Sequence, residues 1–166
     1  MPNRAYIGLG SNLGDRRANL REALERLGQL PASKVVRTSS TYESEPHGDA
    51  KTYFYNSVCE LETEFGSVDV LKHLLEIEKA MGRKRAKGKK LGARIIDLDL
   101  LFYNLEVVST KTLRLPHPRL TTRRFVLLPL GEVAPQLIHP ELSTPISKIL
   151  ANCKDTKRVT LLPPQR

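Results

Sequence analysis

Residues 54–64 read FYNSVCELETE and predict a β-strand. Apolar and polar side chains alternate along it, which is the period of a β-strand whose two faces differ. Cys59 and Leu61 fall on one face, whereas Phe54 and Asn56 fall on the other. The patterns on either side of this strand predict the architecture.

Regular patterns flank the strand in both directions. The apolar run at 5–9, the β-branched run at 35–42 and the strongly apolar run at 95–103 predict three more strands. Apolar residues recur at helical spacing in 15–28 and in 67–82, which predicts two helices. The order β-α-β-β-α-β is typical of a ferredoxin-like α+β fold, an antiparallel sheet with helices.

Each of the two predicted helices has a start signal and a stop signal. Asp15 is expected to cap the first helix and Gly28 to end it, while Ser67 is expected to cap the second and Gly82 to end it. The residues expected to point inward from the second helix are Val70, Leu71, Leu74, Leu75 and Met81.

The residues after 103 predict smaller C-terminal additions. A hairpin is expected at 106–115, short helices at 125–132 and 145–151, and a last strand at 159–162. The sequence shows no repeat, linker or low-complexity tract, so one domain is expected over 1–166.

The segment GLGSNLG at residues 8–14 follows a strand and precedes a helix, as a dinucleotide-binding fingerprint does. Its glycines stand at the first, third and seventh positions, and no GK[ST] follows. Both the Rossmann and the P-loop interpretations are therefore excluded, and a tight turn is expected.

The chain has a formal net charge of +9. Such a surplus attracts polyanions, which include nucleic acids, acidic lipids and phosphorylated small molecules. Cys59 and Cys153 stand far apart, without the spacing of a zinc site or a disulfide framework. Because no signal-peptide or membrane-spanning run is apparent, a cytoplasmic protein without a membrane partner is expected.

Asp97 and Asp99 interrupt the apolar stretch IIDLDLLF. Two residues apart on a strand, their carboxylates project from one face, while Leu98 and Leu100 point into the core. Two carboxylates held together repel each other unless a cation lies between them. Magnesium prefers such oxygen ligands and completes its shell with phosphates and water. The alternative is an exposed strand face with solvated acids.

A basic loop, RKRAKGKKLGAR at 83–94, precedes this strand. Beside an acid pair, its arginines and lysines would hold a polyphosphate while the acids hold the metal. A third cluster, LPHPRLTTRRF, contains His117 between two prolines, followed by Arg123 and Phe125. From this segment alone, a histidine that caps a turn is the simpler interpretation.

These segments together resemble 6-hydroxymethyl-7,8-dihydropterin pyrophosphokinase. The resemblance is carried by AYIGLGSNLGDR, SEPHG…FYN, GRKR…GAR-IIDLDLL and LPHPRLTTRRFVLLPL, in that order, and weakens after about residue 140. It implies attack by the pterin hydroxymethyl oxygen on the β-phosphorus of ATP, with release of AMP.

The resemblance also implies a set of site residues. Two magnesium ions would be bound by Asp97 and Asp99, and these two with Arg83 and Arg94 would be catalytic. The residues implied for ATP are Glu78, Arg83, Arg85, Arg94, Leu100, His117 and Arg123. The residues implied for the pterin are Ser44, Glu45, Pro46, His47, Asn56 and the stacking pair Phe54 and Phe125.

The chain departs from the family at the end of the basic loop. Where the family commonly has Trp-Gly-Pro-Arg, this chain has Leu91-Gly92-Ala93-Arg94. Losing the planar tryptophan predicts activity with looser closure over the substrates. Phe54 replaces a family tyrosine, which keeps stacking and loses a hydroxyl. No general base is assigned, although Asp97 is the nearest candidate.

Two rival interpretations assign the chain to other functional classes. A basic ferredoxin-like domain is also the form of an RNA-recognition motif, but the predicted central strand has Val58, Cys59 and Leu61 where that motif needs aromatic residues. A degenerate relative that binds nucleotide without turnover is the second rival. A monomer that takes small-molecule substrates and no nucleic acid is expected.

Overall fold

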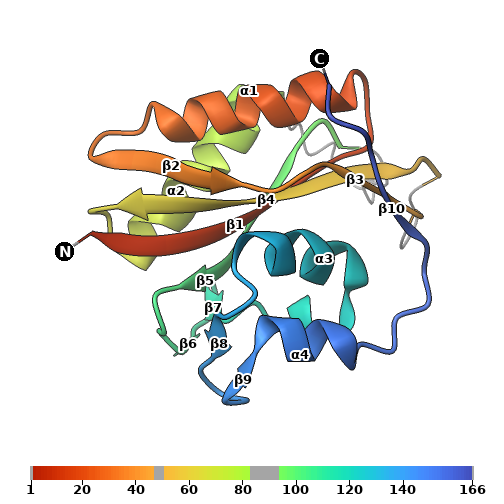
Figure 1. The fold of residues 1–166 in the computed structure, drawn as a ribbon. Helices are drawn as coiled ribbons and strands as arrows, with labels where there is room; N and C mark the ends of the chain where they lie inside the picture. The colour runs from red at the N-terminus through yellow and green to blue at the C-terminus, as the bar shows by residue number, and fades with distance from the viewer. Residues whose placement is uncertain (1, 47–50, 83–93, 166) are drawn as a thin grey trace.

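The computed structural model describes residues 2–46, 51–82 and 94–165 (Figure 1). Its elements are β1 (Asn3–Ser11), α1 (Arg16–Gly28), β2 (Ser33–Thr38), β3 (Tyr42–Ser44), β4 (Phe54–Thr63), α2 (Ser67–Ala80), β5 (Asp97–Tyr103), β6 (Val108–Ser109), β7 (Arg114–Leu115), the 3₁₀ helix η1 (Leu120–Thr122), α3 (Arg124–Val133), β8 (Ile138–His139), β9 (Thr144–Pro145), α4 (Ile146–Ala151) and β10 (Val159–Leu161).

The main sheet is antiparallel, with the strand order β10-β3-β4-β1-β5. β2 also pairs with β4, beside the half of β4 that β3 leaves open. β1 and β4 therefore lie at the centre, and β5 borders β1. This arrangement confirms the ferredoxin-like α+β prediction, with the last strand β10 added at the β3 edge.

Helices cover both faces of the sheet (Figure 1). On one face, α1 and α2 pack over a core that includes Ile7, Cys59 and Leu61. On the other face, α3 and α4 pack over a core that includes Tyr6 and Val58. The alternation along β4 is thus confirmed, but both of its faces are buried rather than one.

The prediction of one strand over 35–42 was wrong. β2 ends at Thr38 and β3 begins at Tyr42, and the two strands pair with different halves of β4. At the break, the Ser39 N–H donates to the Val58 carbonyl at 2.8 Å, and the Val58 N–H donates to Ser39 Oγ at 2.9 Å. The serine side chain replaces a backbone partner there, which β-branched composition does not reveal.

Of the two predicted helix N-caps, one was confirmed and one was wrong. Asp15 caps α1 as predicted, because its Oδ1 accepts from the Ala18 N–H at 3.1 Å. At α2, Gly66 is the N-cap instead of Ser67, whose Oγ donates to Glu106 Oε1 at 3.2 Å. Leu75 is 51% exposed, so its predicted inward position was wrong.

The C-terminal additions largely match their predictions. β6 pairs with β7 in the expected hairpin, and α3, α4 and β10 are present. The pair β8 and β9 and the short η1 were not predicted, because two or three residues carry too little periodicity. In the parts of the chain that the structure describes, no helix has the length and apolar character needed to cross a membrane.

Candidate functional site

A row of residues crosses the sheet on the face that α3 covers. Tyr42, Asn56, Gly10 and Asp97 stand in register on β3, β4, β1 and β5. Since Gly10 has no side chain, the row leaves bare backbone between the amide of Asn56 and the β5 carboxylate. The Gly10 backbone, bordered by Asn56 Oδ1 and the Phe54 ring, forms the floor of the candidate site. At Gly8, two residues earlier, the Leu101 side chain occupies the corresponding space.

The tight turn expected at 8–14 therefore begins later than predicted. Gly8, Gly10 and Ser11 belong to β1, and only the residues after Ser11 leave the strand. Gly14 has φ +74°, a backbone conformation that glycine adopts without strain. Gly8 leaves room for the Leu101 side chain, Gly10 leaves room for the Asn56 amide and the Phe54 ring, and Gly14 makes the turn.

Asp97 and Asp99 lie on the same face of β5, as predicted, while Leu98 and Leu100 are buried in the opposite core. Arg94 Nη1 donates to Asp97 Oδ1 at 2.8 Å. Although the Asp99 side chain reaches solvent, the protein packed around it desolvates the carboxylate and raises its pKa. The nearby charge of Asp97 raises this pKa further, and a bound cation would relieve both effects.

Magnesium fits this donor set when a substrate supplies the remaining ligands. Among the described residues, no three His, Cys, Asp or Glu side chains are grouped to hold a metal ion by themselves. Proteins ordinarily bind magnesium together with a nucleotide through one or two carboxylates, however, while phosphate oxygens and water complete the coordination shell of the ion.

Asn12 joins two chain segments at the edge of the floor. Its Oδ1 accepts from the Arg94 N–H at 2.6 Å, and its own N–H donates to the Arg94 carbonyl at 3.0 Å. Its carbonyl accepts from Thr52 Oγ1 at 2.8 Å. One buried residue therefore holds both the backbone of Arg94, which pairs with Asp97, and the segment that leads into Phe54.

His117 lies beside Asp99 and keeps a defined orientation. The backbone N–H of His117 donates to the Leu101 carbonyl at 2.9 Å, and the ring Nδ1 accepts from the backbone N–H of Arg119 at 3.2 Å. Burial lowers the pKa of the imidazole against the opposing charge of Asp99, which favours the neutral ring. Because Nδ1 is an acceptor, the proton of that ring is on Nε2, which becomes a donor for an anion.

The predicted pterin residues come from β3, β4 and α3. Ser44, Phe54 and Asn56 are buried on the α3 face of the sheet, and Asn56 Nδ2 donates to Ser44 Oγ at 2.7 Å. Phe125 is half-buried at the start of α3, where the Arg123 guanidinium lies 5.6 Å from its ring centroid. Glu45 and Pro46 follow β3 directly.

Several predicted residues lie elsewhere or beyond the described ranges. Glu78 is 3% exposed, and its Oε2 accepts from the Leu98 N–H at 2.9 Å, so it supports the edge strand β5 from α2. The Leu100 side chain belongs to the opposite core. Arg83, Arg85, His47, Leu91 and Ala93 lie outside the described residues.

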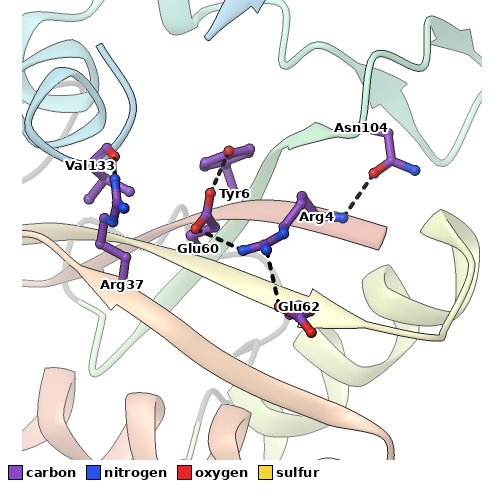
Figure 2. A network of polar contacts seen from close by, with 7 residues as sticks. All are labelled: Arg4, Tyr6, Arg37, Glu60, Glu62, Asn104 and Val133. Atoms are coloured by element: carbon purple, nitrogen blue, oxygen red, sulfur yellow. Dashed lines mark hydrogen bonds and ion pairs between the residues drawn. The ribbon is translucent and has the colours of Figure 1, made fainter. Parts of the chain in front are cut away.

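The far end of α3 is tied to the sheet by polar contacts. Arg37 Nη1 donates to the Val133 carbonyl at 2.9 Å, and Tyr6 OH donates to Glu60 Oε1 at 2.6 Å. Figure 2 shows both contacts. Glu132 accepts from Ser40 Oγ at 2.6 Å and from Tyr42 OH at 2.9 Å. The Arg37 and Glu132 contacts fix the C-terminal end of α3 relative to β2 and β3.

Sequence reasoning missed the residues that organise the site from outside it. Asn12 and Glu132 bear polar side chains without a motif around them, and their partners are distant in sequence. The one available signal for Asn12 was its place directly after β1, where an amide side chain often replaces a lost ladder partner.

Comparison with known proteins places these features in a family. The family model described as 7,8-dihydro-6-hydroxymethylpterin-pyrophosphokinase matches residues 6–135. The 2-amino-4-hydroxy-6-hydroxymethyldihydropteridine pyrophosphokinase of Methylorubrum extorquens is 43% identical over 136 residues, which are 81% of this chain and 85% of that protein. The protein of the same name from Haemophilus influenzae is 38% identical over 160 residues, 96% of this chain and 98% of that protein.

Longer proteins also contain a matching region. The folic acid synthesis protein FOL1 of Dictyostelium discoideum is 36% identical over 163 residues, which are 98% of this chain but 24% of that protein. A crystal structure of Plasmodium falciparum HPPK-DHPS with pteroate matches with a TM-score of 0.73 at 16% identity and covers 91% of this chain and 44% of that one. This structural likeness supports the fold alone.

Proposed function

Since the chain belongs to the 7,8-dihydro-6-hydroxymethylpterin-pyrophosphokinase family, we propose that it transfers diphosphate from ATP to 6-hydroxymethyl-7,8-dihydropterin and releases AMP in folate biosynthesis. The observation that carries this proposal is the acid pair of β5, which lies on the same sheet surface as Asn56, with Gly10 in register between Asn56 and Asp97. One end of the floor suits a metal–phosphate group and the other suits a flat heterocycle.

The bond changes are simple. The hydroxymethyl oxygen of the pterin bonds to the β-phosphorus of ATP, the bond from that phosphorus to the oxygen of AMP breaks, and the hydroxyl proton is released. Because such transfers need little covalent help from the protein, alignment of the two reactants and stabilisation of charge supply most of the acceleration.

The acid half of the site would bind the nucleotide. Asp97 and Asp99 would hold magnesium, whose chemistry when bound is to neutralise the phosphate oxygens. Arg94 is held by Asp97 at 2.8 Å and is positioned to contact a phosphate at the same place. The Nε2–H of His117 would donate to a phosphate oxygen without adding a net charge.

The amide half would bind the pterin between the rings of Phe54 and Phe125. Asn56 Nδ2 donates to Ser44 Oγ. With Nδ2 committed to that bond, Asn56 Oδ1 points toward Gly10. An acceptor in that position recognises the N–H edge of a pterin ring. Offset stacking on each aromatic ring contributes about 0.5–1.5 kcal/mol beyond area burial.

Other assignments stay predictions from the sequence. They are the roles of Arg83, Arg85, Glu78, Leu100 and His47, the number of magnesium ions, the monomeric state, the cytoplasmic location and the extent of the domain over 1–166.

The activity is tested by AMP release from ATP, measured with and without the pterin and with magnesium or a chelator. The wild type should release AMP only when both pterin and magnesium are present, and Asp97→Ala should lose about 10²-fold or more of this rate. Asp69→Ala, which removes an acid from the first turn of α2, should keep the rate. ATP binding without AMP release would identify the degenerate binder, and binding of neither substrate would refute the proposal.

The pterin position has a separate test. Phe125→Ala should raise the Kd of 6-hydroxymethylpterin about tenfold in the presence of magnesium and a non-hydrolysable ATP analogue, and Phe125→Tyr should restore affinity because it keeps the ring. Unchanged pterin affinity in Phe125→Ala would place the pterin elsewhere while leaving the activity assignment intact.

A further inference from the structure

The N-terminus of α3 is capped by a residue from the end of the chain. Arg123, the N-cap, makes no capping bond with its own side chain. Instead, the Arg124 N–H donates to Asp155 Oδ2 at 2.9 Å, and the Lys157 N–H donates to Asp155 Oδ1 at 3.0 Å. Both carboxylate oxygens of Asp155 are thus committed to backbone donors, one of which begins the helix that carries Phe125.

The same stretch of chain also holds the opposite wall of the site. β10 pairs with β3, with Val159 opposite Ser44, and lies beside it in Figure 1. The Glu45 N–H donates to the Arg158 carbonyl at 3.2 Å, and the Arg158 N–H donates to Glu45 Oε1 at 3.1 Å. We call residues 152–161 the C-terminal strap.

One short segment therefore joins two elements that are distant from each other in sequence. Asp155 contacts the start of α3, and three residues later Arg158 contacts the end of β3. The strap lies beyond residues 6–135, the range that the family model matches.

We propose that Asp155 is a positioning residue for pterin binding: through the strap it sets the separation between the Phe125 wall on α3 and the Ser44–Glu45 wall on β3. This inference rests on the pterin position proposed above. Ser44 pairs with Phe54, so the position of β3 also sets the position of the Phe54 ring. A flat ligand stacked between Phe54 and Phe125 is sensitive to the spacing of the two rings, because a displacement of about 1 Å already weakens stacking and misaligns the reacting oxygen.

The electrostatics of Asp155 agree with this role. Desolvation opposes ionisation of the carboxyl group, but the two backbone N–H donors outweigh it and lower the pKa. Asp155 is therefore ionised at neutral pH, as a cap on the positive end of a helix should be.

The experiment compares two affinities in one set of variants. In Asp155→Ala, the Kd of 6-hydroxymethylpterin, measured by its fluorescence with magnesium and a non-hydrolysable ATP analogue, should rise about tenfold, while the Kd of the analogue alone should change by less than about twofold. Asp155→Asn keeps one acceptor oxygen and should restore part of the pterin affinity. Ile149→Val, a core variant of α4, serves as a control for lost stability, and it should leave both affinities unchanged.

Two outcomes would overturn the proposal. Asp155→Ala could lower the melting temperature and leave the pterin Kd unchanged, which would make the strap purely structural. It could also weaken both ligands equally, as a general loss of folded protein would. Phe125→Ala shows whether the proposed pterin position itself has failed. If Phe125→Ala binds pterin with wild-type affinity, the pterin position is wrong. If Phe125→Ala loses affinity but Asp155→Ala does not, the pterin position stands and only the role of Asp155 is refuted.

Discussion

A methyl group at Gly10 would lie 3.3 Å from Asn56 Oδ1 and 3.7 Å from Phe54 Cδ1. Gly10→Ala should therefore push the Asn56 amide away from the floor and raise the pterin Kd about tenfold, since overpacking of this kind costs about 1–3 kcal/mol. The measurement is the pterin titration with the ATP analogue present.

The matched control for this residue is Gly28→Ala. A Cβ there would meet only Val35 Cγ2, at 4.0 Å, and the position is helical, where alanine is preferred to glycine. Gly28→Ala should retain pterin affinity and gain stability. Equal affinities in the Gly10 and Gly28 variants would show that the floor is not where the heterocycle lies.

At the scale of elements, Asn12 connects the end of β1 to the chain before β5 and to the chain before β4. Asn12→Ala leaves the Arg94 N–H without its side-chain acceptor, which costs about 1–3 kcal/mol in a buried position. Because the Arg94 guanidinium should shift relative to Asp97, kcat is expected to fall by about 10²-fold. Steady-state AMP formation measures this loss.

Asn104 is the matched control for Asn12, because its side-chain oxygen also accepts from a backbone N–H, at the opposite end of β1. Its Oδ1 accepts from the Arg4 N–H at 2.9 Å, far along the strand from the acid pair. Asn104→Ala should lower the melting temperature while kcat stays near the wild-type value. If both variants lose activity in proportion to their stability, Asn12 has no special role in placing Arg94.

At the scale of the whole molecule, the burial of His139 is expected to make the stability of the fold depend on pH. His139 is 6% exposed, and its Nδ1 accepts from the N–H groups of Glu141 and Leu142, both at 3.2 Å. Burial lowers the pKa of the imidazole below its ordinary value of about 6.5. The unfolded chain therefore takes up the proton first, and stability should be lost as the pH falls from about 6.5 towards the lower folded pKa.

His139→Asn keeps an acceptor near Nδ1 and cannot titrate in this range. The variant should be less stable at pH 7.5, since it loses the ring contact with Phe102, but its stability should fall less than that of the wild type between pH 7 and 5. Urea unfolding at several pH values compares the two slopes. Parallel slopes would assign the acid sensitivity to other groups.

The two outcomes for strand prediction show where sequence reasoning is sufficient. Side-chain parity within a strand correctly placed Phe54 with Asn56 on β4 and Asp97 with Asp99 on β5. That these two pairs share one face of the sheet follows only from the strand pairing. The interruption between β2 and β3 was not predictable from composition, because it depends on Ser39 replacing a ladder partner of Val58. Nor could Ser67 be excluded as a cap before Glu106 was known to lie beside it.

Local period and motif were enough to predict the β-α-β-β-α-β order of the first 103 residues, apart from the break between β2 and β3, together with the common face of the acid pair and the family. That Asn12 holds Arg94 and that Asp155 caps α3 became apparent only from the folded chain. The physical reason is that a buried backbone N–H must find an acceptor, but any oxygen brought near by folding can serve. Such partners leave no periodic trace in the sequence, and they set the shape of the site.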